Sequence, residues 1–188
     1  MTTKPNATRW GAVSQAIHWL VVLLVLAMAV LGLTMVELPN TPATVKWYAL
    51  HKSIGLTILV LMVLRLAWRL HAGAPPPVAG TPRWQARAAM LTHGLLYALL
   101  FAMPLSGWVI NASSGFPLHW FGLFSVPQFG GRDDALNALA KGWHEWLFWA
   151  LLVLALAHAA AAVWHHLFQR DDTLARMLPR RWSEEDAG

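Results

Sequence analysis

The sequence predicts an all-α integral membrane protein, a bundle of four spanning helices. Apolar residues fill 57% of the 188 positions and charged residues only 12%, whereas a soluble domain carries about 25% charged residues. Four apolar runs are each long enough to cross a bilayer, which takes about 20 residues. These runs and their connections account for the whole chain, so we expect one domain over residues 1–188.

The apolar runs define the expected helices in chain order. The first run follows Lys4 and Arg9, as the core of a secretory leader would, but residues 11–36 form too long a stretch and no small-residue cleavage site follows. We therefore expect this run to remain as a spanning helix. Pro104 lies inside the third run, where membrane helices tolerate proline. The four helices are expected at about residues 16–36, 50–70, 88–111 and 143–168.

The connections between the runs are rich in turn residues. Residues 37–46 (ELPNTPATVK) are short enough to join antiparallel neighbouring helices, and the Pro/Gly segment 72–83 (AGAPPPVAGTPR) cannot continue a helix. The longest connection is 112–142. Its aromatic stretch at 118–124 is expected to lie in the membrane interface, where amphipathic rings are favoured.

Basic residues predict the orientation, because cytoplasmic loops of membrane proteins are enriched in Lys and Arg. With four crossings, both termini and the second connection share one side. That side carries ten basic residues against four, so we expect both termini in the cytoplasm. The net charge of +5 is then a topological signal and not a nucleic-acid-binding surface. The cytoplasmic set is Lys4, Arg9, Arg65, Arg69, Arg83, Arg87, Arg170, Arg176, Arg180 and Arg181, and the outer set is Lys46, Lys52, Arg132 and Lys141.

Five histidines fall in or beside the apolar runs, where an ionisable side chain needs a partner and marks a functional site. They are His18, His51, His93, His144 and His158. Since His144 and His158 are 14 residues apart, a helix places them about 40° apart around its axis and roughly 21 Å apart along it. One helix therefore offers two imidazoles on one face, at two depths.

Depth in the membrane pairs these imidazoles. His51 and His144 lie toward the outside under the topology above, and His18 and His158 toward the cytoplasm. Two rings at one height on facing helices are suited to hold a haem between them, as helix bundles commonly hold cofactors. We therefore expect two bis-histidine haems, which exchange electrons through the haem edge because six-coordinate iron has no open position. The absence of cysteine excludes thiolate ligands, iron–sulfur clusters and covalently attached haem.

Other interpretations of the histidines remain open. Each ring can instead hydrogen-bond a neighbouring helix, or the set can line a proton or metal channel. Zinc takes three or four close ligands, which pairs at two depths cannot supply together. His93 or His165 can replace an inner ligand, most readily His165 for His158. Otherwise His93 is a hydrogen-bonded neighbour of the site, and His165 and His166 contact lipid headgroups.

Two cations are candidates to bind the anionic propionates of a haem. Arg65 is 14 residues beyond His51 and so reaches the inner pair, and Lys52 adjoins the outer ligand. The alternative for both is that their charged ends reach to the headgroup region.

Several stretches of the chain are similar to the bacterial cytochrome b561 family, small four-helix membrane cytochromes with two haems. The resemblance covers essentially the whole chain. It implies that His18, His51, His144 and His158 bind two haem b groups, and that the protein is a multi-pass protein of the bacterial inner membrane. The matching stretches are RWGAVSQAIHWL around His18, WYALHKSIG and LVLMVLRLAWR around and after His51, LTHGLLYALLFAMPLSGW in the third helix, WHEWLFW at His144, ALAHAAAAVWHH at His158, and RDDTLARMLPR.

The resemblance implies transmembrane electron transfer between the quinone pool, with ubiquinone as the candidate quinone, and a redox partner, with lipid around the helices. One type of family member oxidises superoxide outside the membrane and reduces ubiquinone. The loop ASSGFPLHWFGLFSVP is more similar to the general branch than to that type, and the outer cations make only a weak field beside Asp133, Asp134 and Glu145. A third alternative is a cytochrome b subunit of a larger membrane redox enzyme, which docks through residues 112–142. We predict no catalytic residue.

Overall fold

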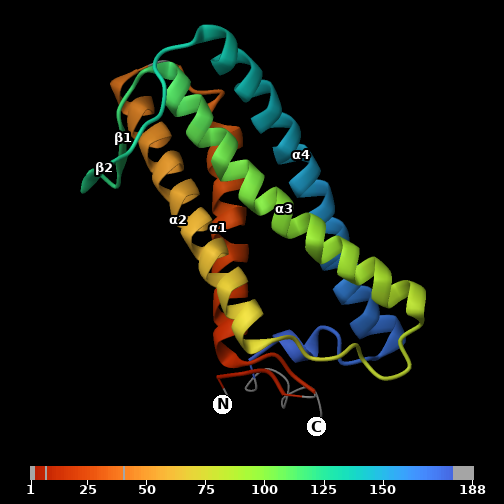
Figure 1. The fold of residues 1–188 in the computed structure, drawn as a ribbon. Helices are drawn as coiled ribbons and strands as arrows, with labels where there is room; N and C mark the ends of the chain where they lie inside the picture. Colours follow the sequence, from red (N-terminus) through yellow and green to blue (C-terminus); the bar gives the residue numbers. More distant parts are fainter. Residues whose placement is uncertain (1–2, 7, 40, 180–188) are drawn as a thin grey trace. The chain divides into compact units, whose positions relative to one another are not determined.

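The computed structural model describes residues 3–6, 8–39 and 41–179, and most of these residues are helical (Figure 1). Among them, four helices are long and apolar enough to cross a membrane, judged by length and composition. The predicted all-α fold class is therefore confirmed. Arg180 and Arg181, which the charge count includes, lie outside the described residues. The long helices are α1 (Ala12–Met35), α2 (Pro42–Ala72), α3 (Arg83–Ser114) and α4 (Asp134–Trp164).

Large apolar side chains are exposed along all four helices. A water-soluble protein rarely exposes contiguous apolar surface of this kind, whereas helices that face lipid require it. The side chains include Leu26 and Val30 on α1, Val60 on α2, Met90 on α3, and Val153 and Leu156 on α4. The surface therefore agrees with a multi-pass membrane protein.

All four helices start before the predicted positions, at residues 12, 42, 83 and 134. The reason is that hydropathy marks the part of a helix that lies in lipid, whereas side-chain caps mark where the helix begins. Thr41 Oγ1 accepts a hydrogen bond from the Thr44 backbone N–H at 3.3 Å at the start of α2. Asp133 Oδ1 accepts one from the Leu136 N–H at 2.9 Å at the start of α4. Polar turns outside the apolar runs are thus helical as well.

The connection between α3 and α4 is shorter than predicted and contains a β-hairpin. Strand β1 (Leu118–Trp120) pairs antiparallel with β2 (Phe124–Val126). Phe121 and Gly122 turn the chain at positive φ angles of 47° and 74°. The Phe121 N–H donates to Ser53 Oγ at 2.9 Å, which ties the hairpin to α2. The hairpin therefore lies beside α2 (Figure 1).

The described chain divides into two compact units, and each long helix contributes to both. Unit 1 contains the described residues of 1–20, 63–97 and 152–188. Unit 2 contains those of 21–62 and 98–151. Each predicted histidine pair belongs to one unit, with His18 and His158 in unit 1 and His51 and His144 in unit 2.

The segment after α4 folds back on the start of α1, within unit 1. A π-helical turn (His165–Gln169) and a 3-10 turn (Ala175–Met177) follow α4. The Trp10 N–H and the Gln15 side chain both donate to the Arg176 carbonyl, at 3.3 and 3.2 Å. The Trp19 indole N–H donates to the Met177 carbonyl at 2.9 Å. These bonds explain why the short tail is ordered beside the helix.

Asp171 is expected to hold this tail in place in a pH-dependent way. Burial by itself raises the pKa of the Asp171 carboxyl, but hydrogen bonds from Thr173 and from His165 Nδ1, the latter at 2.6 Å, lower the pKa overall. A lowered folded-state pKa means that the carboxylate stabilises the fold above its unfolded pKa and loses this effect as pH falls through the folded value.

Asp171→Asn should therefore make proteolysis of the tail about fivefold faster at pH 7, since one hydrogen bond contributes about 1 kcal/mol. The difference should shrink as pH falls through the lowered folded-state pKa of Asp171, because the carboxyl then becomes neutral like the amide. The rate of limited proteolysis with an acid-active and a neutral protease measures this. A difference that persists at low pH would contradict the role of the carboxylate charge.

Candidate functional site

The first candidate site lies in unit 2, where His51 of α2 and His144 of α4 face one another. Their ring centres are 6.2 Å apart and their planes are inclined by 66°. Two imidazoles on opposite sides of one metal ion have ring centres about 6 Å apart, since the metal lies about 2 Å from each ring nitrogen. The spacing of this pair therefore fits two rings that would hold one metal ion between them.

Helix α3 supplies the groups that orient His144. Ser106 Oγ donates its proton to the Met103 carbonyl at 2.8 Å, so it accepts its second hydrogen bond, at 2.8 Å, from His144 Nδ1. This assigns the ring proton to Nδ1 and leaves the lone pair on Nε2. A ring nitrogen fixed in this way is the usual arrangement of a metal-binding histidine.

Two glycines give the rings of this pair their space. A Cβ added at Gly32 of α1 would lie 3.4 Å from His51 Cε1, and one added at Gly107 of α3 would lie 3.4 Å from His144 Cε1. His51 Nδ1 is buried without a hydrogen-bond partner among the described residues. A buried unpaired ring nitrogen is rare, and it fits a site completed by a bound group.

The second candidate site lies in unit 1, where His18 of α1 and His158 of α4 are brought together. Their ring centres are 6.5 Å apart and their planes are inclined by 82°. The ring of His93, on α3, lies 5.3 Å from that of His158. The sequence assigned no firm role to His93. Whether His93 lies close to His158 depends on the rotation of α3 about its axis, which the pattern of apolar residues does not give. His165, considered as a substitute for His158, is bonded to Asp171 instead.

The two predicted cations lie beside the two histidine pairs. Arg65 Nε donates to the Tyr97 hydroxyl at 3.2 Å, and Arg65 NH1 lies 3.0 Å from His18 Nδ1. Lys52 Nζ donates to Asn111 Oδ1 at 2.8 Å. Neither cation belongs to an ion pair within the described part of the chain. Both charges are thus left uncompensated close to the sites.

The ligand chemistry of each site is that of two imidazoles. Within residues 3–6, 8–39 and 41–179, no group of three His, Cys, Asp or Glu side chains is placed to hold a metal ion. A zinc site takes three or four protein ligands. Any metal bound here would therefore need its remaining ligands from a larger bound group.

Comparison with known proteins gives relatives over most of the chain. The chain is 38% identical over 180 residues to cytochrome b561 homolog 2 of Escherichia coli K12, covering 94% of each chain. It is 40% identical over 133 residues to cytochrome b561 homolog 1 of the same organism, covering 70% of this chain and 74% of that protein. It is 31% identical over 176 residues to the probable superoxide oxidase CybB of Yersinia pestis, covering 92% of this chain and 97% of that protein.

The family assignment follows from these similarities and from a match along nearly the whole chain. The model of the prokaryotic cytochrome b561 family matches residues 9–180. That range includes all four long helices and both histidine pairs. The protein belongs to the prokaryotic cytochrome b561 family, whose members are transmembrane electron-transfer cytochromes with b-type haem.

Proposed function

We propose that this protein carries electrons across the bacterial inner membrane through two haem b groups and exchanges them with the quinone pool. One haem is held by His51 and His144 and the other by His18 and His158. The observation that carries this proposal is that both pairs face one another at ring-centre distances of 6.2 and 6.5 Å. Helix α4 supplies one ligand to each haem.

The residues of each site fit a haem better than a bare metal ion. A porphyrin supplies four of the six ligands of its iron, so two histidines complete the set. Two observations support a bound group of this kind. His51 Nδ1 is buried and unpaired among the described residues, and Gly32 and Gly107 leave space beside the rings of His51 and His144. A bound haem supplies a one-electron iron couple, which exchanges electrons without binding a substrate at the metal.

The protein holds and tunes these groups through its own side chains. Ser106 fixes the tautomer of His144 so that Nε2 faces the metal position. Arg65, placed at His18, supplies positive charge for a haem carboxylate at the inner site. Lys52 has the same proposed role at the outer site, with Asn111 holding its ammonium group.

The orientation of the protein is proposed from its charges. The positive-inside count supports both termini in the cytoplasm, with His18 and His158 nearer that side. We propose that residues 1–188 act as one transmembrane cytochrome domain. Electrons then pass between a partner at one membrane face and quinone dissolved in the lipid.

Ubiquinol reduction tests the quinone link. Purified, haem-loaded protein mixed anaerobically with a short-chain ubiquinol should develop the α band of reduced haem b within seconds. His71→Ala, which changes a histidine outside both pairs, should be reduced at the same rate. A protein that dithionite reduces fully and ubiquinol does not reduce would contradict exchange with the quinone pool.

Superoxide is a second candidate electron donor, favoured by the 31% identity to the probable superoxide oxidase of Yersinia pestis. Superoxide would lose one electron and leave as dioxygen, and two such electrons with two protons convert ubiquinone to ubiquinol. Of the predicted outer cations, Arg132 is paired with Asp134 at 3.0 Å, which weakens any attraction of an anion. A xanthine oxidase superoxide flux that leaves the oxidised haems unreduced would exclude this donor.

A protein partner is the remaining proposed alternative. A cytochrome b subunit of a larger redox enzyme would stay bound to its partner through the connection that carries the β1–β2 hairpin. Purification from native membranes in mild detergent distinguishes the cases. A stoichiometric second polypeptide supports the subunit role, and a single polypeptide that ubiquinol reduces supports independent electron transfer.

Ser106→Ala is expected to weaken haem binding at the outer site about tenfold to a hundredfold, the usual range when the hydrogen bond to a metal-binding histidine is lost. The measurement is the rate at which apomyoglobin captures haem from the purified protein. Ser125→Ala is a matched control because its hydroxyl bonds His119, which belongs to neither pair, at 3.2 Å. Equal rates in the two variants would contradict the orienting role of Ser106.

A further inference from the structure

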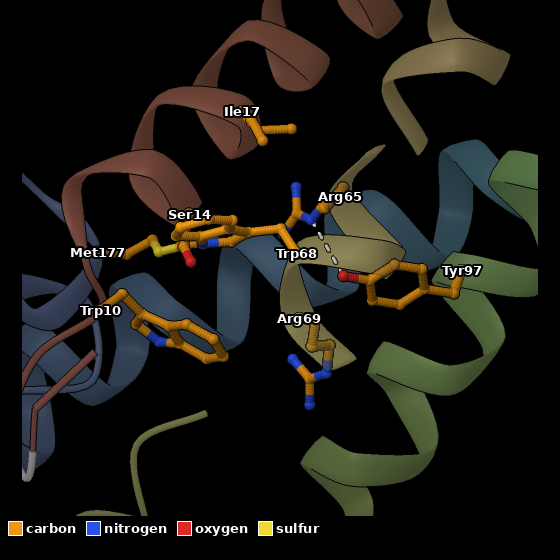
Figure 2. Close-up of a pocket in the computed structure, with 8 residues that line it drawn as sticks. All are labelled: Trp10, Ser14, Ile17, Arg65, Trp68, Arg69, Tyr97 and Met177. Carbon is orange, nitrogen blue, oxygen red and sulfur yellow. Dashed lines mark hydrogen bonds between the residues drawn. The ribbon is translucent and has the colours of Figure 1, made fainter. Parts of the chain in front are cut away.

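A small pocket in unit 1 lies between the start of α1, the end of α2 and α3 (Figure 2). It is partly open, and the roughly 270 Å³ of space between its walls includes solvent at its mouth. Its walls include two arginines and three aromatic side chains. These are Trp10, Arg65, Trp68, Arg69 and Tyr97, and Figure 2 shows them grouped around the same space.

The two arginines carry charge that no carboxylate balances. Arg65 and Arg69 are one helical turn apart on α2, and neither forms an ion pair with any residue that the structure describes. The guanidinium carbon of Arg69 lies 5.5 Å from the Trp10 ring centre and 5.9 Å from that of Tyr97. Stacking on rings satisfies the face of a guanidinium and leaves its N–H edge available for an oxyanion.

The neutral groups of the pocket are also donors without acceptors. Trp68 Nε1 is buried and has no hydrogen-bond partner among the described residues. The Tyr97 hydroxyl accepts a bond from Arg65 Nε, so its own proton is free to be donated. Buried donors are normally paired, and an unpaired one destabilises the fold by about 1–3 kcal/mol. The pocket therefore has a surplus of donors as well as of positive charge.

We propose that this pocket binds an oxyanion, a carboxylate or a phosphate, through Arg69 and Arg65 with Trp68 and Tyr97 as neutral donors. Charge-assisted bonds from guanidinium groups to planar oxyanions are among the strongest that side chains make. Arg65 links the pocket to the inner histidine pair, because its NH1 lies 3.0 Å from His18 Nδ1. Arg69 lies in the last turn of α2, where an apolar helix leaves the lipid.

Two sources can supply this oxyanion. One is a carboxylate of the haem at the inner pair, and this source rests on the proposed function. The other is the phosphate of an anionic phospholipid, because basic pockets between membrane helices on the cytoplasmic side bind such headgroups. The second source does not depend on haem.

Three variants separate these sources. Arg69→Gln removes the charge, and Trp68→Phe removes only the indole N–H. Arg87→Gln is the control, since it removes an exposed arginine of α3 that does not line the pocket. Each protein is purified in dodecyl maltoside, and two quantities are measured: phospholipid phosphorus per chain and the midpoint potential of each haem.

A phosphate ligand predicts that Arg69→Gln and Trp68→Phe lose about one phospholipid per chain relative to Arg87→Gln, with unchanged haem potentials. A carboxylate ligand predicts that they lower the potential of one haem only, because removal of a nearby positive charge or donor favours the oxidised form. Loading the protein with haem dimethyl ester should abolish that shift.

The proposal is overturned if both pocket variants match Arg87→Gln in phospholipid content and in both potentials. This result differs from a failure of the proposed function. If the wild-type protein carries no haem at His18 and His158, the carboxylate source is excluded, and the phospholipid measurement alone then decides whether the pocket binds an oxyanion.

Discussion

Replacing His144 with alanine should lower the haem content of the purified protein from two to about one per chain, and His51→Ala should do the same. Each substitution removes one of two imidazoles that face one another at 6.2 Å in unit 2. A haem held by a single histidine binds more weakly and exposes an open iron position. The remaining haem, which we propose is held by His18 and His158, should keep the spectrum of a bis-histidine site.

The haem that disappears must depend on which pair is broken. Since His18→Ala and His158→Ala break the other pair, the haem they leave should differ in α-band position and midpoint potential from the one left by His144→Ala. His119→Ala is the control, because His119 is exposed on the hairpin and bonded to Ser125. If all four ligand variants left the same haem, the assignment of the two pairs would be wrong.

Gly107→Leu should empty the site at His51 and His144 almost as effectively as loss of a ligand. A single Cβ at Gly107 would already lie 3.4 Å from His144 Cε1, so a leucine side chain must displace the ring or the haem beside it. Overpacking of this kind destabilises by about 1–3 kcal/mol, or roughly tenfold to a hundredfold weaker haem binding. Gly107→Ala should have a much smaller effect, because 3.4 Å is an ordinary contact distance.

Gly142→Leu is the matched control for this substitution. Gly142 also lies in a helix close to His144 in the chain, but a Cβ added there meets no atom within 4 Å. Both proteins are purified, and their haem-to-protein ratios are compared. A Gly107→Leu protein that binds haem as well as the Gly142→Leu protein would show that the space at Gly107 is not needed by the site.

The sequence predicted the histidine pairs because depth along a membrane helix follows directly from residue number. Each residue advances the helix by a fixed rise, so the 14-residue spacing on α4 places its two histidines at two heights. The topology then assigned His51 to the height of His144, and His18 to the height of His158. No knowledge of helix rotation was required, since each pair needed only a ring on another helix at its own level.

The neighbours of these histidines could not be predicted in the same way. Whether Ser106, Gly107 or His93 faces α4 depends on the rotation of α3 about its axis. A helix that is apolar on every side gives no pattern from which to read that rotation. Small residues inside apolar helices, such as Gly32 and Gly107, were the available signal, since they mark places where another group comes close.

The β1–β2 hairpin was missed for a different reason. Its strands have three residues each, too short for an alternating pattern to stand out. The turn at Phe121 and Gly122 carried the only local signal, a glycine that accepts a positive φ angle. The hairpin is fixed by bonds to Ser53 and Thr57 of α2, which are contacts distant in the sequence.

Electron paramagnetic resonance of the fully oxidised protein, with a haem count on the same sample, tests the central claim most directly. The imidazole planes are inclined by 66° in one pair and 82° in the other. Two haems per chain are therefore expected, both low-spin and both with the strongly anisotropic signal of steeply crossed imidazole ligands. A single haem per chain, or a high-spin signal that accounts for half of the iron or more, would contradict the two histidine pairs as haem ligands.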